Sequence, residues 1–164
     1  MDFNPEISLR SWAKSLEDAL DISIGMTDEG AFVMQTAGGA NVGIEPVPNQ
    51  RALVLTGELG AVDDTATVRW YQSLLVVNFT PALTGTGFIG MEPQTRQLVL
   101  RLPWSPPEDQ WHEESFLQLL ALFARHVDQL APLIATPAIE NVLNSAAAAD
   151  AAAAGSALTP SSLA

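Results

Sequence analysis

The chain contains no cysteine among its 164 residues. Disulfide bonds, thiolate metal ligands and cysteine nucleophiles are therefore excluded. A chain without disulfides fits a reducing compartment. Its length indicates a single domain, large enough to bury one sizeable hydrophobic core.

Basic residues are also scarce, because seven Lys and Arg stand against 19 Asp and Glu, for a formal net charge of −12. Proteins that bind nucleic acid present a cationic surface to the phosphates, and anionic membrane surfaces attract the same kind of protein. The charge balance therefore argues against both as partners. It favours a partner that is basic or apolar.

Long apolar runs are missing too. No stretch of the sequence approaches the roughly 20 apolar residues that span a bilayer, and the opening residues, MDFNPEISLR, lack the charged-then-apolar form of a signal peptide. We expect a cytoplasmic protein that does not insert into membranes.

The hydrophobic periodicity predicts helices at both ends of the domain. The first is expected to begin at Asn4 and Pro5, with Leu9, Trp12 and Leu16 on its apolar face. A long last helix is predicted from the capping-box pair Ser105 and Glu108 to about Leu130, with Pro132 ending it.

Between these helices lie five predicted strands, at 31–36, 42–47, 51–58, 86–92 and 95–102. The third has apolar residues on both faces and is therefore expected at the centre of the sheet. Short loops between neighbouring strands favour antiparallel pairing. The order α-β-β-β-α-β-β-α predicts an α+β fold, with helices packed on a twisted antiparallel sheet.

The central helix, predicted at 64–79, is apolar nearly all round. One stripe comprises Val68, Tyr71, Leu75 and Phe79, and an opposite one comprises Ala66, Trp70 and Val77, with Leu74 between them. A helix of this kind must be covered on two sides. One sheet of the same chain covers only one of them, so we expect a second subunit and a homodimer.

Residues 136–164 differ in composition from the rest, and from Ser145 the chain is almost uncharged and rich in alanine. A short alanine helix without an amphipathic face is marginal in water. We therefore predict a folded domain at 1–135 and a disordered tail, with a frayed helix as the alternative.

The chemical motifs are weak. GTGFIG at 85–90 matches the dinucleotide pattern G-x-G-x-x-G, but a strand rather than a helix is predicted after it, so the glycines are expected to admit a bulge or a close backbone. His112 and His126 lie about four turns apart and are predicted to be surface residues. Adjacent carboxylates such as Asp63 and Asp64 fall at turns and helix starts. We predict neither an enzyme nor a cofactor or metal site.

The middle of the chain resembles a known family. LVLTGELG, a helix ending SLLVVN, and GTGFIGMEPQTRQLVLRLPW are similar to the core of the class I type III secretion chaperones, the Tir-chaperone or CesT-like family. The matching features are Gly57, Leu74, Leu75, Asn78, the 85–92 strand, the turn at 92–95, Leu98 and Leu100. The resemblance covers roughly residues 5–131.

The resemblance implies a small, acidic, cytoplasmic homodimer. Members of the family bind N-terminal segments of secreted effector proteins, keep them export-competent and deliver them to the secretion ATPase. The implied dimer contacts are Trp70, Leu74, Val77, Phe88 and Ile89. The implied cargo contacts are Leu9, Trp12 and Leu16, if that stripe is exposed, with Val33, Val42, Ile44 and Val54; the alternative is that all of these are core.

Other functions stay open at this point. A broad-cargo export regulator is one form of the chaperone hypothesis. A small dimeric adaptor that binds a folded protein through its sheet is the first alternative, and an enzyme that binds a nucleotide or small ligand with the 85–90 glycines is the second.

Overall fold

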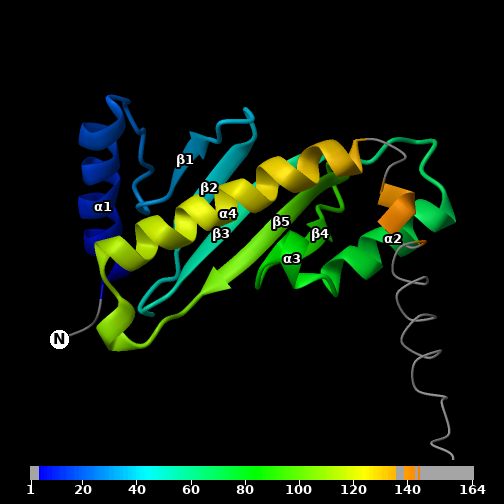
Figure 1. Cartoon of the computed structure of the whole chain (residues 1–164). Coiled ribbons are helices and arrows are strands. Elements are labelled where there is room, and N and C mark those ends of the chain that lie inside the picture. Colours follow the sequence, from blue (N-terminus) through cyan, green and yellow to red (C-terminus); the bar gives the residue numbers. More distant parts are fainter. Residues whose placement is uncertain (1–3, 136–138, 143, 145–164) are drawn as a thin grey trace, which may run out of the picture.

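A five-stranded antiparallel sheet forms the centre of the computed structural model, which describes residues 4–135, 139–142 and 144. The strand order is β1-β2-β3-β5-β4 (Figure 1). The strands are β1 (Phe32–Gln35), β2 (Asn41–Pro46), β3 (Leu53–Ala61), β4 (Phe88–Met91) and β5 (Gln97–Trp104). The strand with two apolar faces is β3, and its predicted central place is confirmed because it pairs with β2 and with β5.

The helices cover one face and both ends of this sheet. They are α1 (Pro5–Leu20), α2 (Val68–Asn78), the short α3 (Pro81–Thr84), a 3₁₀ turn η1 (Glu108–Gln110) and α4 (Glu113–Ile134). In Figure 1, α4 crosses the sheet, with α1 at one end of the molecule and α2 at the other. The predicted α+β order is confirmed, with α3 and η1 as additions.

The core lies between the sheet and α4. Phe116, Phe123 and Val127 of α4 are almost completely buried against the inward side of the sheet. The contact is closest at Gly57 of β3, where a Cβ atom would lie 2.2 Å from a methyl group of Val127. A side chain at this position would therefore push α4 off the sheet.

The central helix begins later than the sequence predicts, at Val68 rather than residue 64. The Asp63 carboxylate accepts hydrogen bonds from the backbone N–H and the hydroxyl of Thr65, both at 2.6 Å. A short polar side chain that binds the backbone in this way competes with helix formation. The hydroxyl of Thr67 then caps the helix by accepting from the N–H of Trp70 at 3.1 Å.

The last helix also differs at both ends. It begins at Glu113, with His112 as its cap, because Glu108 forms an ion pair with Arg51 at 2.9 Å instead of closing a capping box. At the other end Pro132 lies inside the helix, which continues to Ile134. Proline removes a single N–H donor there, and its position in the last turn limits the cost.

The packed part of the chain extends past the predicted boundary at residue 135. Ile139 is 1% exposed and belongs to the core, and the Glu140 carboxylate accepts a hydrogen bond from the Thr67 hydroxyl at 3.2 Å. The predicted disorder at 136–164 falls mainly on residues outside the described part. Among the described residues, no helix has the length and apolar character needed to cross a membrane.

Candidate interaction surfaces

The outward side of α2 is an apolar stripe that no other part of the described chain covers. Its members are Val68, Tyr71, Leu75 and Phe79, whose exposed fractions are 75%, 38%, 63% and 87%. Single apolar side chains on a surface are ordinary, but a contiguous row on one helix marks a contact site. Of the two stripes predicted on this helix, this one is therefore the candidate contact surface.

A groove of about 240 Å³ lies between this stripe and the edge strand β4. Asn78 forms part of its wall, and both atoms of its amide bind the main chain of Ile89: Oδ1 accepts from the N–H at 2.6 Å and Nδ2 donates to the carbonyl at 3.2 Å. The groove is lined by Tyr71, Leu74, Leu75, Asn78, Ile89, Gly90, Met91 and Leu98. Apolar side chains dominate this lining.

The predicted dimer contacts mostly lie on the other side of α2. Leu74, Val77 and Ile89 are buried within the chain, and Trp70 is half-buried, whereas Phe88 is 47% exposed. The two stripes are similar in apolar character, so the sequence does not indicate which of them faces the chain's own sheet. Of the five predicted dimer contacts, Phe88 is therefore the most exposed, and the outward stripe is the accessible side of α2.

The sheet face opposite α4 is a second open surface. The strand registers place Val33, Gly43, Thr56, Arg101 and Phe88 in one row across all five strands. Glu58, Val99 and Gly90 are paired in the neighbouring row. These rows form the floor of a groove of about 440 Å³. We call this surface the outer sheet groove.

Five of the predicted cargo contacts are core residues. Leu9, Val42 and Ile44 are completely buried, and Trp12 and Leu16 are 6% and 9% exposed. The condition that the first helix exposes part of its apolar stripe is therefore not met. The other two residues lie on the open face: Val33 is 60% exposed, and Val54 is half-buried on the outward side of β3.

The apolar side of α1 is covered by an aromatic cluster. Trp12 lies 5.1 Å from Phe116 and 5.3 Å from Trp111, between ring centroids, and Trp104 stacks on Trp111 at 5.3 Å. The indole N–H of Trp111 donates to the Ser8 hydroxyl at 3.1 Å. These contacts join α1, β5 and α4, so three of the four tryptophans serve packing.

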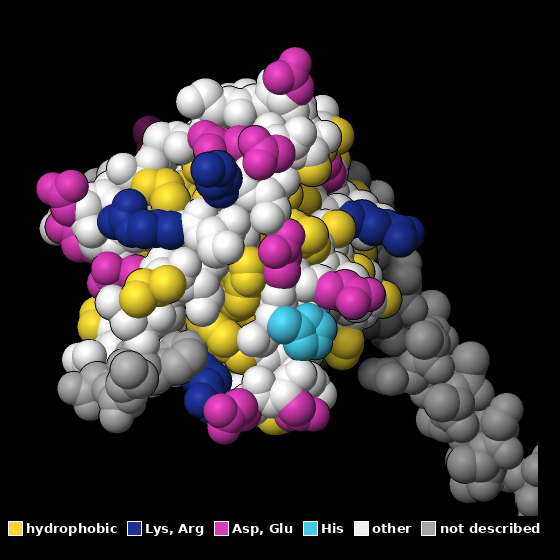
Figure 2. Space-filling view, turned by 90° about the vertical axis from the view of Figure 1, so that its left-hand side faces the viewer, with side chains coloured by type: hydrophobic (Ala, Val, Ile, Leu, Met, Phe, Trp, Pro, Cys, Tyr) yellow, Lys and Arg dark blue, Asp and Glu magenta, His cyan; other side chains and the backbone are white. Residues whose placement is uncertain are grey.

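Figure 2 views the molecule from this end. Acidic side chains are spread over this face, and apolar atoms are visible in a band between them. Charged side chains therefore interrupt the apolar surface at the α1 end of the molecule. This surface is less suited to an extended apolar contact than the stripe on α2.

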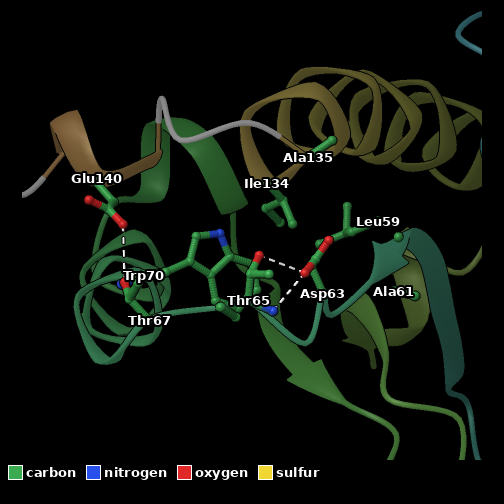
Figure 3. Close-up of a pocket in the computed structure, with 11 residues that line it drawn as sticks. Leu59, Ala61, Asp63, Thr65, Thr67, Trp70, Ile134, Ala135 and Glu140 are labelled. Atoms are coloured by element: carbon green, nitrogen blue, oxygen red, sulfur yellow. Dashed lines mark hydrogen bonds between the residues drawn. The ribbon is translucent and has the colours of Figure 1, made fainter.

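A pocket of about 480 Å³ lies beside Trp70, between the start of α2 and the end of α4 (Figure 3). Asp63 and Glu140 supply its carboxylates. The two hydrogen bonds from Thr65 hold the pKa of Asp63 below its usual value, so this carboxylate stays ionised and is a poor general acid. No motif in the sequence indicates this pocket, because Glu140 lies beyond the predicted domain.

The 85–90 glycines lack the strand–turn–helix setting of a dinucleotide-binding motif. Gly85 ends α3 with a φ of 61°, and the strand β4 follows, so no helix opens after the motif. A Cβ on Gly87 would lie 3.1 Å from the Arg101 carbonyl oxygen, which confirms the alternative that a backbone approaches closely here. Among the described residues, no three metal-ligating side chains come together.

His126 is a correction to the prediction of two surface histidines. It is only 9% exposed, while His112 is exposed at the start of α4. A Cβ on Gly85 would lie 3.1 Å from Nε2 of His126. Because Gly85 has no side chain, the turn after α3 reaches α4 and covers the imidazole.

Comparisons with known proteins identify solved structures with a similar fold. Among solved structures, the chain is similar to one described as the ExsC–ExsE complex, with a TM-score of 0.66, 14% identity, and coverage of 80% of this chain and 97% of that chain. A second is the HopA1–SchA chaperone–effector complex, with a TM-score of 0.60, 13% identity, and coverage of 77% and 95%.

A third similar structure is YbjN of E. coli, described as a putative transcription regulator. It has a TM-score of 0.57 and 15% identity, with coverage of 80% of this chain and 92% of that chain. At these identities the structural likeness establishes the fold alone. A search of the curated proteins finds no match.

The sequence itself matches one family model, described as the Tir chaperone protein (CesT) family, over residues 11–131. This range is well over half of the chain and includes every element from α1 to α4 except the ends of these two helices. The chain therefore belongs to the Tir chaperone protein family, and it is a type III secretion chaperone.

Proposed function

We propose that this chaperone acts as a cytoplasmic homodimer that binds the N-terminal segments of secreted effector proteins, keeps them export-competent and delivers them to the secretion ATPase. One observation carries the proposal: the described residues leave two separate surfaces uncovered. The stripe on α2 suits a rigid apolar partner, and the outer sheet groove suits an extended segment.

The stripe on α2 is assigned to a second copy of the chain. Leu75 on α2 and Phe79 at its C-cap are 63% and 87% exposed, and their burial would supply the apolar centre that stable subunit contacts have. The adjoining groove beside β4 extends this surface past Asn78. A two-fold contact that matches α2 and β4 of one protomer with the same elements of the other is self-complementary.

The outer sheet groove is assigned to cargo. It crosses all five strands and exposes Val33 and Phe88 at its two sides. A chain segment held there in a non-globular form buries its apolar side chains without a folded partner. The solved complex of a chaperone with its effector, to which this chain is similar, supports a role of this kind.

The test is co-purification with effector segments. Each candidate effector from the same genome is expressed with this chain twice, as its N-terminal segment alone and as its folded remainder. We expect the N-terminal segment to co-purify and to stay sensitive to protease elsewhere along its length, while the folded remainder does not bind. Capture of only the folded remainder would contradict the proposal.

That contrary result would support the alternative function, a dimeric adaptor or regulator that binds a folded protein through its sheet. The similarity to YbjN, described as a putative transcription regulator, is the observation that favours this alternative. The two functions make opposite predictions for the same pair of fragments, so a single set of co-purifications separates them.

A further inference from the structure

Two glycines in the outer sheet groove are not required by the chain's own structure. Among the described residues, a Cβ on Gly43 would meet nothing closer than the Thr56 carbonyl oxygen at 3.8 Å, which is an ordinary contact. A Cβ on Gly90 would meet none of their atoms within 4 Å. Neither residue has a positive φ. Gly57 of the same sheet is different, because α4 fills the space where its side chain would lie.

Glycine in a strand interior has a cost. It loses more backbone freedom on folding than other residues and leaves the sheet without a side chain to pack. Strand glycines that neither a bulge nor internal packing explains are typical of places where another molecule approaches the backbone. Gly43 and Gly90 are of this kind, and both line the outer sheet groove.

Their positions define a path across the sheet. Gly43 is on β2 and Gly90 is on β4, with β3 and β5 between them. Three strand spacings and an offset of one row separate the two glycines by about 15 Å. Between them the floor is formed by Thr56, Val99 and Arg101.

The charge around this path is mostly negative. Glu45, Glu58 and Glu92 line the groove together with one cation, Arg101. The Glu58 carboxylate accepts a hydrogen bond from the Asn41 amide at 2.9 Å, which holds it in place. A groove with this balance, on a chain of net charge −12, attracts a cationic partner.

We propose that Gly43 and Gly90 are clearance positions, where one bound segment lies directly on the sheet backbone, and that the three carboxylates select a segment carrying Lys or Arg between its apolar residues. This inference rests on the proposed function, in that the segment is cargo. It adds to that function the contact points and the charge of the cargo.

The experiment begins with a probe. Random 15-residue peptides displayed on phage are selected on the purified full chain, and the most enriched peptide is synthesised with a fluorescent label. We expect enriched peptides to be apolar with net positive charge. Binding should weaken at least tenfold between 50 and 300 mM salt, because screening reduces the attraction.

The variants Gly43→Val and Gly90→Val then test the clearance. Valine suits a strand, so each variant should keep or raise the Tm, while its affinity for the labelled peptide falls at least tenfold. Gly25→Val is the matched control, since a Cβ there also meets no atom of the described part of the chain within 4 Å but the residue lies outside the groove. Glu58→Gln should weaken binding and reduce its salt dependence, whereas Glu114→Gln should change neither.

Several results would overturn the inference. These are enrichment of acidic or neutral peptides, no enrichment over an unrelated protein, or unchanged binding by both valine variants. A change in molecular mass for Gly90→Val without a loss in peptide affinity would assign that glycine to subunit contact instead. If effector segments still co-purify with the double valine variant, the inference fails while the proposed function stands.

Discussion

The side-chain amide of Asn78 pairs with the main chain of β4 in the way that a peptide group of a neighbouring strand would. It thereby joins the end of α2 to the edge of the sheet. The amide carries both donor and acceptor groups, and the main chain of Ile89 pairs with one of each. The contact is half-buried, so water replaces it poorly when the side chain is removed. Asn78 is also one of the residues on which the family resemblance rests.

We expect Asn78→Ala to lower the free energy of unfolding by about 2 kcal/mol, because two hydrogen bonds are lost and the Ile89 groups are left unpaired. Urea denaturation of the variant and the parent measures this difference. Asn144→Ala is a suitable control, since its amide oxygen binds only the exposed Arg69 side chain among the contacts described. An effect of Asn78→Ala no larger than that of the control would show that the pairing contributes little.

Asp63 provides a pH-dependent prediction. Hydrogen bonds from the Thr65 hydroxyl and N–H lower the pKa of this carboxyl in the folded chain. A group with a depressed folded pKa stabilises the fold above its unfolded pKa, and this contribution is lost as the pH falls through the folded value. Thr65→Ala should move the pKa of Asp63 up toward its ordinary value, as measured by carbon-detected NMR titration of the carboxyl. A pKa that does not move would assign the shift to another cause.

Single residues are where sequence reasoning was weakest. His126 was predicted to be a surface residue, but burial at this site depends on Gly85, which is 41 positions away and has no side chain. In the same way, position 57 requires glycine because Val127 of α4 occupies the space of a side chain there. Such contacts depend on how elements meet, and local periodicity carries no information about them.

At the scale of elements, α2 shows what a pattern can and cannot predict. Both apolar sides of the helix were predicted, but Ala66 of the second stripe precedes the first turn of α2. In the structure Trp70 and Val77 face the core, and the other stripe faces outward. Which stripe faces the sheet depends on the rotation of the helix about its axis. That rotation is fixed by Asn78 and by burial of Val77, and neither is visible in the hydrophobic pattern.

The two sides of α2 should respond differently to the same substitution. Leu75 is 63% exposed, so Leu75→Asp should leave the protomer folded and abolish dimerisation, since an unpaired charge cannot be buried between subunits. Trp70 packs against the core, so Trp70→Asp should lower the stability of the protomer itself by about 3 kcal/mol or more.

Light scattering and thermal melts of the two variants separate these effects. The expected pattern is half the parent's mass with a largely retained protomer melt for Leu75→Asp, and a lower Tm at every protein concentration for Trp70→Asp. Glu114→Asp, on an exposed part of α4, is the control variant, and its mass and Tm should equal those of the parent. If Leu75→Asp keeps the parent's mass, the outward stripe is not the subunit contact.

At the scale of the whole molecule, the mass in solution is the first quantity to measure. The proposed homodimer should have about twice the chain mass of 17.4 kDa by light scattering during size exclusion. The mass should fall on dilution, because association depends on protomer concentration. A monomer at all accessible concentrations would leave the stripe on α2 without its proposed partner.

The fold as a whole followed closely from the sequence. Alternating residues predicted every strand of the sheet, and a strand with two apolar faces predicted its centre. Helix ends were less accurate, because Asp63 and Glu108 make contacts that redirect the chain. The cargo residues were predicted least well: Val42 and Ile44 have the apolar character of a binding surface, but they fill the core.

The pairing of Asn78 with Ile89 also bears on how far such sheets can grow. A sheet that joins others edge to edge needs an open strand at both sides, and runaway joining of this kind leads to fibres. Here the middle of the β4 edge is already occupied by a side-chain amide of the same chain. The proposed cargo surface is thus bordered on one side by a closed edge. A stray strand that adds at the β1 edge cannot be followed by an endless series.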